Sequence, residues 1–248
     1  MIELAIIGGT GLNTLEGINI TKKRVMRTPY GEPSGPLTFG EYNNKEIVFL
    51  PRHGSGHTIP PHKINYRANI WALKEIGVSE VISIAAVGGI TKELYPARLA
   101  IPDQIIDYTW GRNNTFCEGA EGNVVHIDFT HPYDKNLRNR IILAAKKAEI
   151  NIFKGGTYGA TQGPRLETSA EISRMERDGC HVVGMTGMPE AALAREAGLA
   201  YATCVVVANH AAGKKGQEEI SMKEIELHLK KGMEQVKLLL IEILNDKE

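Results

Sequence analysis

The sequence predicts a single α/β domain in which a central, mixed and twisted β-sheet is flanked by helices. Short apolar runs alternate with segments of helical periodicity along the 248 residues. Several of these runs are continuously apolar rather than alternating, as expected for strands buried on both faces. Because no internal repeat or Pro/Ser-rich linker interrupts the chain, we expect one domain over residues 1–248.

The first strand is expected at the start of the chain, directly before a glycine-rich turn. In chain order, the predicted strands are Leu4–Ile7, Lys45–Leu50, Val81–Ala86, Leu99–Tyr108, Phe153–Tyr158, Val182–Met185 and Tyr201–Ala208. Between them, the sequence favours helices over Ile64–Ile76, Lys135–Ala148, Thr168–Asp178, Pro189–Ala197 and Ser221–Leu244.

The last predicted helix has the clearest start signal. Ser221 is followed three residues later by Glu224, which is the spacing of a capping box. Long loops are expected at Gly54–His62 and Thr109–Val124, and the second is long enough to have a function beyond connecting two elements.

The composition excludes several classes of protein. Lys plus Arg and Asp plus Glu balance at 29 each, so no overall field favours nucleic acid or an anionic membrane. No apolar run approaches the roughly 20 residues that span a bilayer, and the first residues lack the basic region of a signal peptide. The three widely spaced cysteines include no CxxC pair, which argues against a disulfide framework or a zinc site. We therefore expect a cytoplasmic protein.

Three strand ends carry groups suited to binding phosphate. The turn at residues 8–11 (Gly-Gly-Thr-Gly) offers backbone N–H groups and the Thr10 hydroxyl, although it is equally compatible with a structural tight turn. Arg52 and His53 follow a strand, where a guanidinium suits bidentate binding of an oxyanion. The segment 85–89 ends another strand in small residues that allow a ligand close to the backbone. Because these ends share the carboxyl edge of the sheet, they predict one anion site.

Polar side chains later in the chain extend this set. Asn209 follows a buried apolar run, where an open α/β sheet places its ligand, and its amide both donates and accepts hydrogen bonds. Glu167 precedes a predicted helix and Met185 ends a predicted strand. In isolation, each of these two is equally consistent with a structural role, Glu167 as a favourable charge at a helix N-terminus and Met185 as core packing.

Taken together, these segments resemble the trimeric purine nucleoside phosphorylase and methylthioadenosine phosphorylase family. The matching stretches occur in family order and are GGTG (8–11), PRHGSGHTIPPHKINYRANIWALKEIGV (51–78), AAVGG (85–89), QGPRLET (162–168), GMTGMPEAALAREAG (184–198) and VVVANHAAG (205–213). The resemblance implies that inorganic phosphate attacks the anomeric carbon of a nucleoside, releasing a free base and a ribose 1-phosphate. It implies phosphate as co-substrate and neither a metal nor an organic cofactor.

The resemblance also implies roles for individual residues. Phosphate would be held by Thr10, Arg52, His53, the backbone of Ala86, and Thr186. Leu166 and Met185 would contact the nucleoside, with Met185 packed under the ribose. His126 matches a position that a neighbouring subunit supplies to the 5′ end, so the resemblance implies a homotrimer, or a dimer of trimers, that completes the site.

Two departures from the methylthioadenosine branch concern the base. Asn209 and Glu167 match the base-binding residues of the 6-oxopurine phosphorylases, where the methylthioadenosine branch has acidic residues and a serine, respectively. A carboxylate accepts a hydrogen bond from N1–H, which hypoxanthine and guanine carry and neutral adenine lacks. Asn209 donates to O6 or N7, where negative charge develops as the base departs. We therefore expect a 6-oxopurine and assign Glu167 and Asn209 to catalysis.

The 5′ position favours the opposite branch. Where the 6-oxopurine enzymes carry a histidine, the alignment places Met222, with Ile225 one turn later. An apolar pair suits a methylthio group and would desolvate a hydroxyl without compensation. Together the two ends predict 5′-methylthioinosine as substrate.

Alternatives are a general inosine/guanosine phosphorylase and a methylthioadenosine phosphorylase with an unusual base site. Two alternatives come from other classes of protein. A dinucleotide-binding oxidoreductase is disfavoured because the sequence lacks the full glycine fingerprint. A non-catalytic ligand-binding or scaffold protein is disfavoured because it would leave Arg52, Thr186, Glu167 and Asn209 without a shared purpose.

Overall fold

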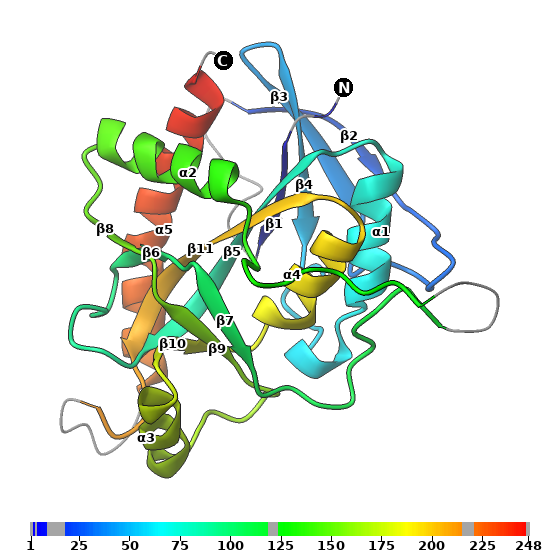
Figure 1. Ribbon diagram of the computed structural model, residues 1–248. Helices are drawn as coiled ribbons and strands as arrows, with labels where there is room; N and C mark the ends of the chain where they lie inside the picture. The colour runs from blue at the N-terminus through cyan, green and yellow to red at the C-terminus, as the bar shows by residue number, and fades with distance from the viewer. Residues whose placement is uncertain (1, 3, 9–17, 119–123, 215–220, 247–248) are drawn as a thin grey trace.

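The computed structural model describes residues 2, 4–8, 18–118, 124–214 and 221–246. It contains an eleven-stranded mixed sheet with helices on both faces, as the sequence predicts (Figure 1). The strands are β1 (Leu4–Gly8), β2 (Asn19–Arg24), β3 (Leu37–Tyr42), β4 (Lys45–Pro51), β5 (Glu80–Gly89), β6 (Leu99–Ile101), β7 (Gln104–Asp107), β8 (Ile152–Lys154), β9 (Thr157–Ala160), β10 (Cys180–Gly184) and β11 (Ala200–His210). The helices are a 3₁₀ turn, η1 (Pro61–Lys63), and α1 (Tyr66–Glu75), α2 (Lys135–Lys147), α3 (Ser169–Arg177), α4 (Gly187–Glu196) and α5 (Met222–Asn245).

The centre of the sheet is parallel. Strand β1 lies between β4 and β5 and runs parallel to both, and β11 runs parallel to β5 on its other edge. Strands β2 and β3 extend the sheet antiparallel beyond β4, and β10 joins the end of β5 antiparallel. The carboxyl ends of β1, β4, β5 and β11 therefore point the same way, which confirms the shared sheet edge expected from the sequence.

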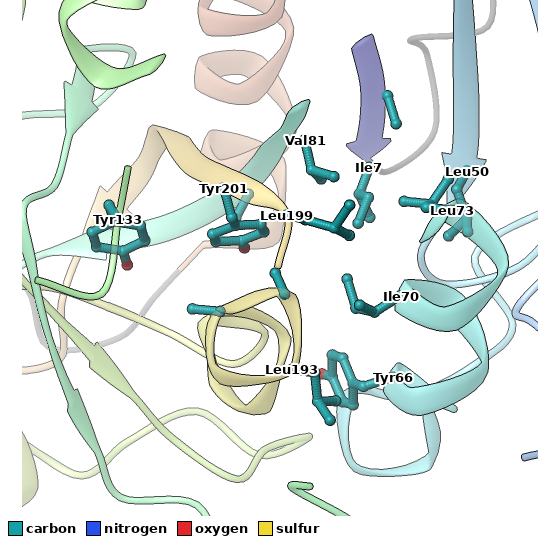
Figure 2. Packing of buried hydrophobic residues seen from close by; sticks show 14 of the residues in the cluster. Ile7, Leu50, Tyr66, Ile70, Leu73, Val81, Tyr133, Leu193, Leu199 and Tyr201 are labelled. Atoms are coloured by element: carbon teal, nitrogen blue, oxygen red, sulfur yellow. The ribbon is translucent and has the colours of Figure 1, made fainter. Parts of the chain in front are cut away.

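Two apolar layers cover the sheet. Helices α1 and α4 pack on one face, where Ile70 and Leu73 of α1 point towards Ile7 and Leu50 (Figure 2). Helices α2 and α5 cover the other face through residues such as Ile141 and Leu240 (Figure 1). The strands between these layers are buried on both sides, which explains their continuous apolar sequences.

Two predicted strands are each broken into two. The predicted strand Leu99–Tyr108 is interrupted after Ile101, where Pro102 cannot donate a ladder hydrogen bond, so β6 pairs with β11 while β7 pairs with β9. The predicted strand Phe153–Tyr158 is broken at Gly155 and Gly156, which have φ of 95° and 94°. Left-handed backbone of this kind favours glycine and redirects the chain.

A β-bulge interrupts β11 close to its end. Val207 pairs with Val87 and Asn209 pairs with Gly88, so Ala208 is an extra residue with no partner on β5. The strand also continues to His210, so Asn209 lies within the strand and not after it, in contrast to the prediction.

Candidate active site

A cavity of about 620 Å³ lies at the carboxyl end of the central strands, beneath α5. Its floor includes Ala86 and Gly88 of β5 and Ala208 and Asn209 of β11. Ala86 is exposed although it lies within a central strand, because its methyl group faces this open space and not a packed helix.

Most of the predicted site residues meet at this cavity. Of the predicted set, those that line it are Arg52, His53, Ala86, Leu166, Glu167, Met185, Thr186, Asn209 and Ile225. Met222 and His126 do not line it, and both are exposed in the single chain. Thr10 lies outside the described residues.

Arg52 lines the cavity, but most of its N–H groups already donate to acceptors within the protein. Its Nε and Nη2 donate to the two carboxylate oxygens of Glu190 at 2.7 and 2.9 Å, and Nη1 donates to the Ile84 carbonyl at 2.8 Å. Both side chains of this ion pair are at most 2% exposed. Burial by itself lowers the pKa of Arg52, but the charge and hydrogen bonds of Glu190 outweigh it and raise that pKa. The sequence predicts bidentate binding of a ligand oxyanion by Arg52, whereas the bidentate partner in the structure is the carboxylate of Glu190.

His53 presents a neutral imidazole. Its Nδ1 lies 2.9 Å from the carbonyl oxygen of Ile59, which only accepts, so Nδ1 carries the hydrogen and Nε2 is the free nitrogen. Burial, together with the nearby charge of Arg52, lowers the pKa of His53 to about 4. The ring also stacks on His57 at a centroid distance of 4.2 Å, which fixes its plane.

Thr186 occupies the turn between β10 and α4. It is buried, and its side chain makes no capping hydrogen bond to the helix that it precedes. Its backbone N–H donates to the Tyr158 hydroxyl at 3.3 Å. A threonine in this place brings a hydroxyl to the cavity wall, and a hydroxyl donor suits an anion.

Glu167 and Asn209 line the cavity with hydrogen-bonding capacity to spare. The Thr161 hydroxyl donates to Oε1 of Glu167 at 2.7 Å, which orients the carboxylate. Nδ2 of Asn209 donates to the His210 carbonyl at 2.7 Å, which fixes the amide and leaves a second N–H and the Oδ1 acceptor. The pair offers an acceptor and a fixed amide to one ligand.

The α5 side of the cavity carries both apolar and charged side chains. Ile225, Leu229 and Met233 line it from successive turns of the helix, together with Glu226, Lys230, Glu234 and Lys237. The predicted apolar pair is therefore found only in part, since Met222 is 63% exposed in the first turn of α5.

The comparisons with known proteins agree with this geometry. The model of the phosphorylase superfamily matches residues 3–245. The chain belongs to this superfamily. It is 56% identical over 224 residues to a probable S-methyl-5′-thioinosine phosphorylase of Xanthomonas campestris pv. campestris, covering 90% of each protein. It is 45% identical over 248 residues to the 6-oxopurine nucleoside phosphorylase of Pyrococcus furiosus, covering 98% of this chain and 92% of that one. The crystal structure of a methylthioadenosine phosphorylase from an antarctic soil metagenomic library superposes with a TM-score of 0.92 at 35% identity, covering 98% of this chain and 85% of that chain.

The phosphorylase-superfamily site includes residues that sequence reasoning missed. Glu190 had one available signal, because it is a lone carboxylate beside Pro189 at the start of a small apolar segment, 189–194. Arg112 lies in the loop Thr109–Val124, whose length suggested a function, and Thr161 lies six residues before Glu167, but no pattern in the sequence identifies the contacts of either residue. The structure also shows that no helix among the described residues has the length and apolar character to cross a membrane.

Proposed function

We propose that this chain catalyses the phosphate-dependent cleavage of 5′-methylthioinosine to hypoxanthine and 5-methylthioribose 1-phosphate. The observation that carries the proposal is that Glu167 and Asn209 line one cavity with three apolar residues of α5, Ile225, Leu229 and Met233. A polar pair suited to a 6-oxopurine and apolar side chains suited to a thioether are thus available to one ligand.

The polar pair favours a 6-oxopurine over adenine. Glu167 accepts from N1–H of hypoxanthine, while the remaining N–H of Asn209 donates to O6 or N7. Adenine has no hydrogen on N1, so it would leave without a donor the Glu167 oxygen that Thr161 does not bond, at a cost of about 1–3 kcal/mol or more for a charged group. Asn209 also acts in the reaction, because its hydrogen bond strengthens as negative charge develops on the departing base.

The other end of the cavity is proposed to hold phosphate. Thr186, His53 and the backbone at Ala86 are assigned to its oxygens, together with Thr10. Since Glu190, Ile84 and Ser83 already accept from most of the Arg52 N–H groups, Arg52 is assigned a smaller share, through the second hydrogen of Nη1. Phosphate on one side of the sugar stabilises the positive charge that develops on the ribosyl group. No metal or organic cofactor is needed for this chemistry.

The 5′ end is proposed to be completed in a homotrimer, or a dimer of trimers. His126 and Met222 are exposed in the single chain, which is compatible with a neighbouring subunit bringing His126 to the sugar and covering Met222. The closely related chain from Xanthomonas campestris bears the name of a methylthioinosine phosphorylase, which supports the methylthio assignment. On this proposal the enzyme acts in purine salvage in the cytoplasm.

A general 6-oxopurine nucleoside phosphorylase is the second candidate. The relative from Pyrococcus furiosus carries that name at 45% identity, and Met222, one half of the predicted methylthio pocket, does not line the cavity. Both observations concern the sugar and leave the base assignment unchanged.

One experiment separates the candidates. With phosphate present, we expect kcat/KM to be highest for methylthioinosine, compared with inosine and methylthioadenosine. Equal or faster cleavage of methylthioadenosine would contradict the base assignment. A strong preference for inosine would replace the proposal by the second candidate.

A further inference from the structure

Arg112 connects three walls of the cavity without lining it. Its guanidinium donates to the carbonyls of Thr161 and Gln162 at 3.2 and 2.8 Å and to the Met185 carbonyl at 2.8 Å. It also donates to the hydroxyl of Tyr66 at 3.3 Å, and that hydroxyl donates in turn to the carbonyl of Pro61. The segments that it joins are far apart in the sequence, so this side chain adds to the contacts that hold them together, among them the hydrogen bond from the Thr161 N–H to the Gly184 carbonyl.

Each of these segments contributes a cavity residue. Thr161 orients Glu167, Met185 precedes Thr186, and Pro61 itself lines the cavity. The Arg112 fork therefore links the base-binding carboxylate to the sugar and phosphate side of the cavity. All six of its hydrogen bonds end on neutral oxygens, four of them backbone carbonyls.

We propose that Arg112 is a positioning residue that sets Glu167 against Met185 and thereby fixes the base selectivity of the site. The inference rests on the proposed function for the identity of the ligand. Its physical basis is geometric: the planar guanidinium spreads five N–H groups over acceptors on different segments, whereas a lysine ammonium presents all its donors from one nitrogen. A displacement of about 1 Å in such a site costs about a hundredfold in rate.

The test compares Arg112→Met and Arg112→Lys with a matched control. Arg138 also donates to two backbone carbonyls, those of Pro102 and Ile101, but it does not line the cavity or contact a segment of the site. Arg138→Met therefore removes guanidinium-to-carbonyl hydrogen bonds of the same kind, although fewer of them, away from the site. For each variant, kcat/KM is measured for methylthioinosine and methylthioadenosine, together with Tm.

We expect Arg112→Met to lower kcat/KM for methylthioinosine by about a hundredfold and to reduce its preference over methylthioadenosine at least tenfold. Compared with Arg112→Met, Arg112→Lys should recover part of kcat/KM for methylthioinosine but little of the preference over methylthioadenosine. In a further variant, Arg112→Ala, added free guanidinium should restore part of both quantities. The Arg138→Met enzyme should keep the wild-type preference even where its Tm falls.

An unchanged preference in Arg112→Lys, or an equal loss of preference in Arg138→Met, would overturn the inference. If Arg112→Met does not fold, the preference measured for Arg112→Lys and the guanidinium rescue experiment test the inference instead. Failure of the proposed function is seen separately, because it shows as a different preferred substrate in the wild-type enzyme, against which the same variants are then measured.

Discussion

Asn209 combines a donor and an acceptor at a point of the cavity where a carboxylate would provide acceptors only. Its orientation comes from its hydrogen bond to the next carbonyl in the chain and from the bulge beside it. The ability of this position to donate a hydrogen bond to the base therefore depends on one atom, Nδ2 of Asn209.

Replacement of that amide by a carboxylate tests its role. We expect Asn209→Asp to lower kcat/KM for methylthioinosine at least about tenfold, equivalent to about 1.4 kcal/mol. The variant loses the donor to the departing base and places a second negative charge near Glu167. Steady-state kinetics at saturating phosphate measure the effect, with Tm as the control for folding, and wild-type kinetics in a folded variant would refute the assignment.

His53 predicts a pH dependence of stability. Its pKa is about 4 in the folded protein, below the value of about 6.5 expected when unfolded. Above pH 6.5 both states are neutral and His53 contributes nothing to this dependence. As the pH falls from 6.5 to 4, the unfolded chain binds the proton first, so the free energy of unfolding decreases.

His53→Gln removes this titration. In urea unfolding at pH 7.5 and pH 4.5, we expect the wild-type protein to lose more stability between the two conditions than the variant does. An equal or larger loss in His53→Gln would show that the imidazole is not held neutral.

Among the elements, α5 depends on a close approach to β11. The Cβ of an alanine at Gly232 would overlap the Cγ1 of Val206, whose β-branched side chain has little rotamer freedom. Gly232 therefore sets the depth at which α5 lies over the cavity floor.

Gly232→Ala tests this contact because two effects oppose each other. Alanine is favoured over glycine in a helix by about 1 kcal/mol, while overpacking a core contact costs about 1–3 kcal/mol. Since the new methyl meets a stiff side chain, we expect a net loss of about 1–2 kcal/mol in the free energy of unfolding measured with urea. Lys231→Ala, on the exposed side of the same helix, should stay within about 0.5 kcal/mol of wild type. Stabilisation by Gly232→Ala would contradict the close packing.

The elements that the sequence predicted correctly are those with a clear apolar pattern, either a continuous apolar run or a helical period. The continuous apolar runs of β1, β4 and β11 and the helices α1 and α2 were predicted to within a few residues. Strand β2 was missed because all its residues are exposed, so it has no apolar signature. Strand β3 was missed although four of its six residues are buried, because Thr38 and Gly40 interrupt its apolar residues. The breaks at Pro102 and Gly155 were missed because each lies inside an otherwise strand-like sequence.

The site could be predicted from the sequence only as a set of residues. Arg52, Glu167 and Asn209 stand out at strand and helix ends, and all three line the cavity. That Glu190, 138 positions away, accepts from two of the Arg52 N–H groups is a consequence of packing α4 against the sheet, which no local pattern records. The Arg112 contacts depend on long-range packing in the same way.

For the whole molecule, ligands that bind only the folded state should stabilise it. At about 100 times its Kd a ligand adds about 2.7 kcal/mol, which corresponds to an increase in Tm of about 5 °C or more for a chain of this size. We expect this increase with hypoxanthine plus phosphate in a thermal-shift measurement. Adenine plus phosphate at the same concentrations should give a clearly smaller increase, and equal increases would contradict the base assignment.

The bulge in β11 has a consequence for how selectivity in this chain can change. In a regular strand only every second side chain faces the ligand, but the extra residue lets both Ala208 and Asn209 line the cavity, while His210 lies buried outside it. Two residues adjacent in the sequence, Ala208 and Asn209, therefore both face the ligand. Varying positions 208 and 209 together explores new base and sugar preferences without disturbing the packed opposite face, so substrate range and foldability are separable at this point of the chain.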